Sequence, residues 1–282
     1  MAPVVAVIGA GGKMGLRVVT RLKDSAQYEA RYCEVAPAAI ERLAQAGLAV
    51  TPTVDAVSVA DLVILAVPDR AAGGISAELA PLARPGACFL MLDPAAAMAG
   101  EIARRPDLHY VVAHPCHPPM FGQQPSDAAR ADYFGGIAAW QDIVMALLQG
   151  SEEAYAMAEN LCRTIMAPVR HAHRVTVEQM AILEPAMAEV VGAAAAVLIH
   201  QAMEEAVARG VPRAAAESFM LGHAQVPLAI LFGVIQAQFS DAARIAIAWG
   251  TERIIQPDWR RVFEPDQVQA AIHAMLHPEA ST

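Results

Sequence analysis

The 282-residue sequence has few features of a secreted or nucleic-acid-binding protein. Its cysteines are few and scattered, without the spacing of a disulfide framework or a zinc site, so we expect a reducing, cytoplasmic location. Acidic side chains outnumber basic ones, and the formal net charge of −9 argues against a nucleic acid as partner. The four cysteines are Cys33, Cys88, Cys116 and Cys162.

The sequence also lacks a clear leader or membrane-spanning segment. The longest run without a charged residue or a histidine, Ala224–Ser240, falls short of the ~20 predominantly apolar residues that cross a bilayer and contains Pro227. The first apolar run follows Pro3 without a basic segment, so we expect no signal peptide. Only 17% of the residues are charged whereas 56% are apolar, which predicts a homodimer with extensive buried interface rather than a membrane protein.

A glycine-rich turn near the N-terminus organises the first half of the chain. Val4–Ile8 is a continuous apolar run typical of a buried strand, and Leu16–Leu22 has helical spacing. Strand, glycine turn and helix in this order are typical of a dinucleotide-binding domain, in which N–H groups at the helix start bind the pyrophosphate. Gly9 can form the tight turn, Gly11 or Gly12 can admit the phosphates, and Gly15 lets the helix approach the strand. The expected cofactor-binding residues of this turn are Gly9, Gly11, Gly12, Lys13, Met14 and Gly15.

Glu34 lies near the end of the next predicted strand, Tyr28–Val35. A carboxylate at this distance from the glycine turn can accept hydrogen bonds from the adenosine ribose and would repel a 2′-phosphate. The sequence therefore predicts NAD as cofactor. Lys13 and Arg31 leave NADP open, and a simple loop cap is the alternative role for Glu34.

Strand and helix patterns then alternate, which predicts an α/β fold with a Rossmann-type, doubly wound parallel sheet. We place the NAD-binding domain at residues 1–174 and an all-helical substrate and dimerisation domain at residues 175–282. Thr176 and Gln179 have the spacing of a capping box, and Pro185 should kink the long helix that follows. The further strands expected are Leu48–Thr51, Asp61–Val67, Ala87–Leu92, Leu108–Ala113 and Ile143–Leu148, with no strand after Val169.

Candidate catalytic groups follow the predicted strands, at the edge where α/β sheets bind ligands. Val67, Pro68 and Asp93 are expected beside the cofactor. His114 precedes Pro115, and His117 lies between Pro115 and Pro118, so prolines stiffen this backbone. An imidazole there can accept the proton of a substrate hydroxyl. The alternatives are a metal site that includes Cys116 and a structural loop with exposed histidines.

Two carboxylates of the long helix could complete this site. Glu184 precedes Pro185, where the helix should break, and Glu189 follows five residues later. Either of them could meet His114 and form an acid–base or divalent-metal site. We therefore predict His114, His117 and Glu184 as catalytic residues and His114, Glu184 and Glu189 as metal ligands. The alternative is a solvated helix face.

Several of these segments resemble known families. The glycine turn, the strand at Ala60–Asp69 and the helical second half are similar to the 6-phosphogluconate dehydrogenase-like superfamily. The His-Pro run is similar to that of prephenate dehydrogenases, whose histidine handles the substrate hydroxyl. The segments Gly9–Gly15, His114–Phe121, Phe134–Gly136 and Ile143–Gly150 most resemble D-apionate oxidoisomerases, NAD-dependent enzymes of branched sugar-acid breakdown.

This resemblance implies an NAD-dependent oxidoreductase that oxidises a hydroxyl next to a carboxylate and moves a carbon substituent. By analogy with ketol-acid reductoisomerases, it also implies a divalent metal ion. Other readings are a prephenate-like or other 3-hydroxyacid dehydrogenase and a non-catalytic NAD-binding sensor.

Two differences from the related families limit the catalytic mechanisms and substrates that fit this chain. The chain has no lysine after Lys23, so the catalytic lysine of β-hydroxyacid dehydrogenases has no counterpart here. Histidine, glutamate or a metal ion must therefore provide the general acid–base catalysis. Ala96 stands near the position where prephenate dehydrogenases carry a serine, which argues against prephenate as substrate.

Overall fold

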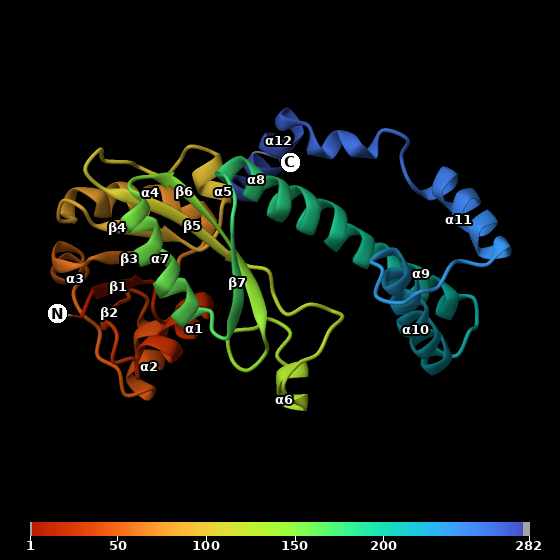
Figure 1. Ribbon diagram of the computed structural model, residues 1–282, viewed down its shortest axis with the longest axis horizontal. Coiled ribbons are helices and arrows are strands. Elements are labelled where there is room, and N and C mark those ends of the chain that lie inside the picture. The colour runs from red at the N-terminus through yellow and green to blue at the C-terminus, as the bar shows by residue number, and fades with distance from the viewer. Residues whose placement is uncertain (1, 279–282) are drawn as a thin grey trace. The chain divides into compact units, whose positions relative to one another are not determined.

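A computed structural model describes residues 2–278 of the chain (Figure 1). These residues form two compact units. The first, the NAD unit, contains the residues up to 182 together with those from 269 onwards, and the second, the helical unit, contains residues 183–268. The predicted boundary at residue 174 lies at the end of the last strand, eight residues before the boundary between the two units, and the predicted helical domain also included the residues from 269 onwards.

The NAD unit is built on a seven-stranded sheet with the order β2-β1-β3-β4-β5-β6-β7. Each neighbouring pair among the first five strands in this order is parallel. β6 is antiparallel to β5, and β7 is parallel to β6. The strands are β1 (Val4–Ile8), β2 (Glu29–Cys33), β3 (Leu62–Leu65), β4 (Cys88–Met91), β5 (His109–Pro115), β6 (Gln141–Gln149) and β7 (Val169–Arg174).

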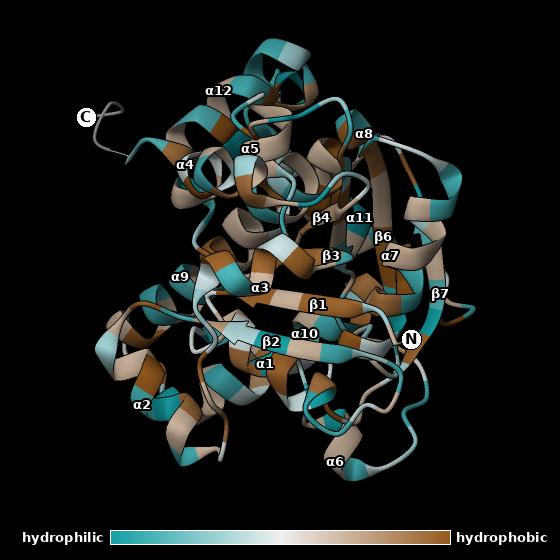
Figure 2. Ribbon diagram, turned by 90° about the vertical axis from the view of Figure 1, so that its left-hand side faces the viewer, coloured by the Kyte–Doolittle hydropathy of each residue, from teal (hydrophilic) through white to brown (hydrophobic). Residues whose placement is uncertain are grey.

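The structure corrects three details of the predicted sheet. The connection from β5 to β6 contains only the short helix α6 (Asp127–Arg130) and no long crossover helix, so the chain returns antiparallel at the same edge. The strand expected at Leu48–Thr51 is absent from this described segment, where only Val50 bridges to Tyr32. β7 was not expected, because its arginines and histidines give it no apolar pattern (Figure 2).

Helices cover both faces of the sheet, so alternate residues of each central strand enter different cores. Val5 and Val7 pack with α1 (Lys13–Leu22), α2 (Pro37–Gln45) and α7 (Glu152–Ile165). Ala6 and Ile8 face the other side. The helices on that side are α3 (Thr53–Val59), α4 (Asp69–Leu79), which runs into a short 3-10 turn at Ala80–Leu82, α5 (Ala95–Met98) and α8 (Val177–Ala181).

The long helical run has the predicted start and the predicted irregularity. The side chain of Thr176 accepts a hydrogen bond from the Gln179 N–H, and the Gln179 side chain accepts one from the Thr176 N–H, which confirms the capping box. After α8 the run continues as a π-helix, Ile182–Ala193, which contains Pro185, and then as α9 (Ala194–Ala208). By length and composition alone, the whole run from Val177 to Ala208 could cross a membrane, a test that the core helices of soluble proteins also pass.

The helical unit leaves much apolar surface exposed. α9 packs against α10 (Arg213–Leu231), and α11 (Asp241–Ile254) begins after Ser240, whose hydroxyl accepts the N–H of Ala243. None of the described residues of α11 is buried. The exposed large apolar residues of this unit include Leu221, Leu231, Phe232, Ile245 and Trp249.

The C-terminal helix belongs to both units. After the turn Trp259–Phe263, α12 (Pro265–Leu276) starts in the helical unit and ends in the NAD unit. Gln269 donates a hydrogen bond to the carbonyl of Met98 at 3.5 Å, and the His277 Nε2 lies 2.8 Å from a carboxylate oxygen of Glu101. The N-terminal and C-terminal parts of the described chain therefore share one unit.

Candidate active site

The glycines of the first turn have distinct structural roles. Gly9 has a left-handed backbone (φ +78°), and a Cβ there would lie 2.6 Å from the carbonyl oxygen of Ala66. At Gly15 a Cβ would lie 2.1 Å from the Gly9 oxygen. Since neither approach is possible for a larger residue, these two glycines let strand, turn and helix pack closely.

The structure gives Gly11 and Gly12 different roles, although the sequence left them as equivalent candidates for phosphate binding. A Cβ on Gly11 would lie 2.4 Å from the carbonyl oxygen of Ala39, so Gly11 makes room for α2. A Cβ on Gly12 would meet its nearest atom, the Gly9 oxygen, only at 3.2 Å. Gly12 is also the N-cap of α1 and lines an open cavity, which makes it the better position for backbone contact with a phosphate.

Glu34 and Arg42 hold Gly11 from both sides. The Gly11 N–H donates to Glu34 Oε2 at 3.0 Å, while the Arg42 Nε and one terminal nitrogen donate to the Gly11 oxygen at 3.1 and 2.9 Å. The other Glu34 oxygen accepts hydrogen bonds from the N–H groups of Val35 and Ala36 at 2.9 and 3.1 Å. The carboxylate is thereby fixed at the end of β2.

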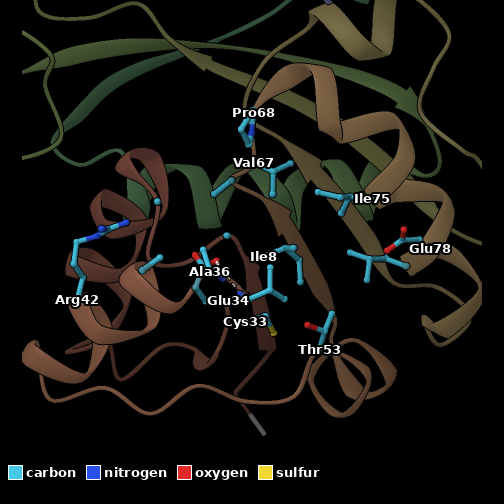
Figure 3. A pocket seen from close by; sticks show the side chains of 16 residues that line it. Ile8, Cys33, Glu34, Ala36, Arg42, Thr53, Val67, Pro68, Ile75 and Glu78 are labelled. Atoms are coloured by element: carbon cyan, nitrogen blue, oxygen red, sulfur yellow. Dashed lines mark hydrogen bonds between the residues drawn. The ribbon is translucent and has the colours of Figure 1, made fainter.

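A cavity of about 420 Å³ opens between the glycine turn and the ends of β2 and β3 (Figure 3). Figure 3 shows Arg42 on one side, Ile75 and Glu78 on the opposite side, and Glu34 between them. Its volume is in the range of nucleotide-sized ligand sites, and its walls are mostly apolar with a few polar groups. The predicted residues Gly9, Gly12, Glu34, Val67 and Pro68 all line it.

His114 lies near the end of β5 and is held by the two residues that follow the neighbouring strand β4. Its Nδ1 lies 3.1 Å from the carbonyl oxygen of Leu92 and 3.9 Å from a carboxylate oxygen of Asp93. Asp93 in turn accepts the N–H of Ala95 at 2.8 Å, at the start of α5. Burial lowers the pKa of His114, although the Asp93 charge and the Leu92 carbonyl act in the opposite direction. The imidazole is therefore neutral at pH 7 and can accept a proton.

His117 lies beside His114, with the ring centroids 6.2 Å apart. Its backbone is left-handed (φ +59°), and its Nδ1 lies 2.9 Å from the carbonyl oxygen of Phe134. A carbonyl oxygen only accepts, so each histidine donates from Nδ1, and each carries its lone pair on Nε2. Both imidazoles therefore lie side by side at the end of β5, and their catalytic roles stay predictions.

The thiol of Cys116 between these histidines does not have the features of a nucleophile. Its backbone N–H donates to the Asp142 carbonyl at 2.9 Å, which continues the pairing of β5 with β6. Burial and the negative charge of Asp142 raise the pKa of the thiol, so the thiolate is disfavoured.

The remaining predicted residues lie in different parts of the chain. Lys13 is at the start of α1, with its Nζ 5.3 Å from the ring centroid of Phe134, and Met14 is half-buried beside it. Glu184, half-buried, and Glu189, exposed, both belong to the π-helix of the helical unit. Their catalytic and metal-binding roles stay predictions.

Two site residues were missed from the sequence. Arg42 lies on a helix face, where a lone arginine is usually solvated, and only its approach to Gly11 singles it out. Phe134 contacts Lys13, Arg17 and His117. Its sequence signal is the pair Gly135 and Gly136 that follows it, where φ is +73° and +84°.

Comparison with known proteins identifies the family of the chain. Residues 122–276 match the family described as phosphogluconate dehydrogenase (decarboxylating) C-term. The D-apionate oxidoisomerase of Rhizobium rhizogenes is 46% identical over 95% of this chain and 98% of its own, and that of Cupriavidus necator is 44% identical over 95% and 97%.

A solved structure from Cupriavidus necator is also similar throughout. It is described as a semialdehyde dehydrogenase NAD-binding protein in complex with calcium and NAD. It is 43% identical and superposes with a TM-score of 0.95 over 98% of this chain and 100% of its own.

Proposed function

The chain belongs to the D-apionate oxidoisomerase family, and we propose that it oxidises a hydroxyl of a branched sugar acid, D-apionate or a close analogue, with NAD as hydride acceptor. The observation that carries this proposal is the pair of imidazoles at the end of β5, in the unit that holds the nucleotide-sized cavity. A non-catalytic NAD sensor would have no use for two oriented basic nitrogens there.

The cavity residues fit NAD. Glu34 presents a carboxylate, already held in place, to the ribose hydroxyls, and Gly12 opens the start of α1 to the pyrophosphate. A 2′-phosphate beside Glu34 would suffer like-charge repulsion, which favours NAD over NADP. Bound there, NAD supplies the acceptor for the hydride that leaves the substrate carbon.

His114 is the proposed general base. Its Nε2 carries the lone pair, and its lowered pKa keeps it unprotonated at neutral pH. Asp93, 3.9 Å from Nδ1, stabilises the imidazolium that forms when the substrate hydroxyl gives up its proton. His117 is oriented in the same way, and its Nε2 is proposed to accept a hydrogen bond from a second hydroxyl of the sugar acid.

A divalent metal ion is a further proposal. The carboxylates of Glu184 and Glu189 are donor types that such ions accept, and the similar Cupriavidus necator protein was crystallised with calcium. If His114 is the third ligand, its Nε2 lone pair binds the ion and another group must act as the base. Such an ion, when bound, would polarise the substrate oxygens and favour the carbon shift of a ketol-type isomerisation. Glu184, half-buried next to Pro185, is the better candidate of the two glutamates.

The direct test is turnover. NADH absorbance is followed after the protein is mixed with NAD and D-apionate, with prephenate and other 3-hydroxyacids in parallel, and each reaction is repeated with EDTA. We expect NADH with D-apionate, none with prephenate, and a loss of turnover with EDTA that added divalent metal restores. Absence of turnover on every sugar acid, although NAD binds, would contradict the proposal. Full activity in EDTA would show that the reaction needs no divalent metal ion.

We also propose a cytoplasmic homodimer formed through the helical unit. Large apolar side chains such as Phe232 and Ile245 are 76% and 70% exposed, far more than isolated surface residues of a stable monomer require. A second copy of the chain is the partner that would bury such a surface symmetrically. The four cysteines are free thiols, which fits a reducing compartment.

A further inference from the structure

The loop at residues 132–139 connects His117 to the cofactor-binding helix α1. The Phe134 carbonyl accepts the Nδ1–H of His117 at 2.9 Å. The ring of the same residue lies 5.8 Å from the His117 ring and 5.1 Å from the guanidinium of Arg17 on α1. One residue thus contacts both a proposed site histidine and the helix whose first turn should bind the pyrophosphate.

Arg21 fixes this loop to α1. Its Nε donates to the carbonyl of Gly136 at 2.8 Å, and its terminal nitrogen donates to the carbonyls of Ile137 and, at 2.9 Å, Ala167. Arg17 adds a hydrogen bond to the Gly135 carbonyl at 3.3 Å. A guanidinium has several donors in one rigid plane, so it can hold three carbonyls at once, which an ammonium on a flexible chain does poorly.

The loop is also rigid within itself. Asp132 Oδ2 accepts the N–H groups of Ile137, Ala138 and Ala139 at 3.0, 2.9 and 3.1 Å. Gly135 is packed so closely that a Cβ would lie 2.4 Å from Gln141 Oε1. The Phe134 carbonyl is therefore a fixed acceptor, and its position follows that of α1.

We propose that Arg21 is a positioning residue, which through this loop fixes the tautomer and the orientation of His117 relative to the bound cofactor. A carbonyl held opposite Nδ1 keeps the proton on that nitrogen and the lone pair on Nε2, which faces away from the loop. The left-handed backbone of His117 (φ +59°) needs such an external restraint, because it is strained for a residue with a Cβ. The role rests on the proposed function, in which His117 binds the sugar acid.

The test compares Arg21→Lys with Arg163→Lys, a matched change of an arginine on α7 that pairs with Glu159 at 2.9 Å. For each protein, NAD affinity, steady-state kinetics on D-apionate and the imidazole ¹⁵N spectrum are measured. The His117 signals are assigned by their loss in His117→Gln. In the wild type we expect the Nδ1–H tautomer of His117.

Arg21→Lys should convert this signal to a tautomer mixture. Its kcat/KM should fall by about 10- to 100-fold, because a small misplacement of a site group has effects of this size, while NAD affinity stays within about twofold. Arg163→Lys should match the wild type in all three measurements.

Three results would overturn the inference. They are an Nε2–H tautomer in the wild type, an unchanged tautomer and kcat/KM in Arg21→Lys, and a loss of NAD affinity as large as the loss of kcat/KM. If no sugar acid is turned over at all, the proposed function fails, but the tautomer of His117 and the NAD affinity still decide the role of Arg21.

Discussion

The Glu34 carboxylate accepts the backbone N–H of Gly11 at 3.0 Å, so the end of β2 is bonded to the glycine turn that follows β1. The side chain that should bind the ribose is thereby oriented before the cofactor arrives. Affinity for NAD should gain from this preorganisation, because less side-chain freedom is lost on binding.

Glu34→Gln should weaken NAD binding by about 10-fold, since loss of a charged acceptor costs about 1.5 kcal/mol. Discrimination against NADP should fall as well, because the repulsive charge is gone. Calorimetric titration with both cofactors measures this, and Glu29→Gln at the exposed start of the same strand is the control. Equal NAD affinity in Glu34→Gln and wild type would show that the carboxylate does not bind the ribose.

His114→Gln should lower kcat by about 10²- to 10⁴-fold, the usual contribution of a general base, and leave NAD affinity unchanged. His109→Gln changes a histidine at the other end of β5 and should retain nearly full turnover. Steady-state kinetics on D-apionate decide the matter. A His114 variant with wild-type kcat would show that another group is the general base.

The lowered pKa of His114 predicts how activity and stability vary with pH. The unfolded chain, whose histidine titrates near ~6.5, binds more protons below that pH than the folded chain does. The associated stability is therefore complete above ~6.5 and is lost as the pH falls toward the lower pKa of the folded state. Thermal unfolding from pH 7.5 to 5 should show a steeper decline for wild type than for His114→Gln. Turnover should also persist below ~6.5, and a fall in kcat/KM centred above ~6.5 would contradict the assignment.

Gly135→Ala should destabilise the NAD unit by about 3 kcal/mol, because it combines a left-handed backbone with overlap against Gln141. Gly136→Ala has a similar φ but no atom within 4 Å of the added Cβ, so it should cost only about 1 kcal/mol. Urea unfolding of the two variants measures the difference. Equal losses would mean that Gln141 moves aside without penalty.

Ile245→Asp should weaken the proposed homodimer by about 30-fold, the effect of ~2 kcal/mol at an interface, because it places a charge on the exposed apolar face of α11. Light scattering after size exclusion gives the mass, and Glu252→Gln on the same helix is the control. A wild-type protein that is monomeric at micromolar concentration would exclude the dimer.

Sequence reasoning was most successful where one local rule decides the structure. Buried β-branched runs predicted β1 and β3, and the spacing of Thr176 and Gln179 predicted the capping box at the start of α8. Each of these signals depends only on neighbours a few residues away. The same holds for the histidines at the end of β5, whose place follows from the strand before them.

Features that depend on residues far apart were not predictable. The position of Gly11 against Ala39, the bond from His117 to Phe134 and the three carbonyls held by Arg21 each join separate segments. β7 was not predicted for a different reason. It is an edge strand, and its side chains at Arg170, His171 and His173 are exposed, so burial imposes no alternation on them.

The return of α12 to the NAD unit makes the helical unit an insertion with two attachment points. Ile272 and Leu276 are buried, Gln269 donates a hydrogen bond to the last residue of α5, and His277 pairs with Glu101 just after it. A protease that nicks the backbone once between residues 183 and 268 should therefore not liberate a fragment under native conditions. Both pieces would stay associated through the nucleotide-binding part, as happens when a loop is cut in a fold whose two ends are fastened together.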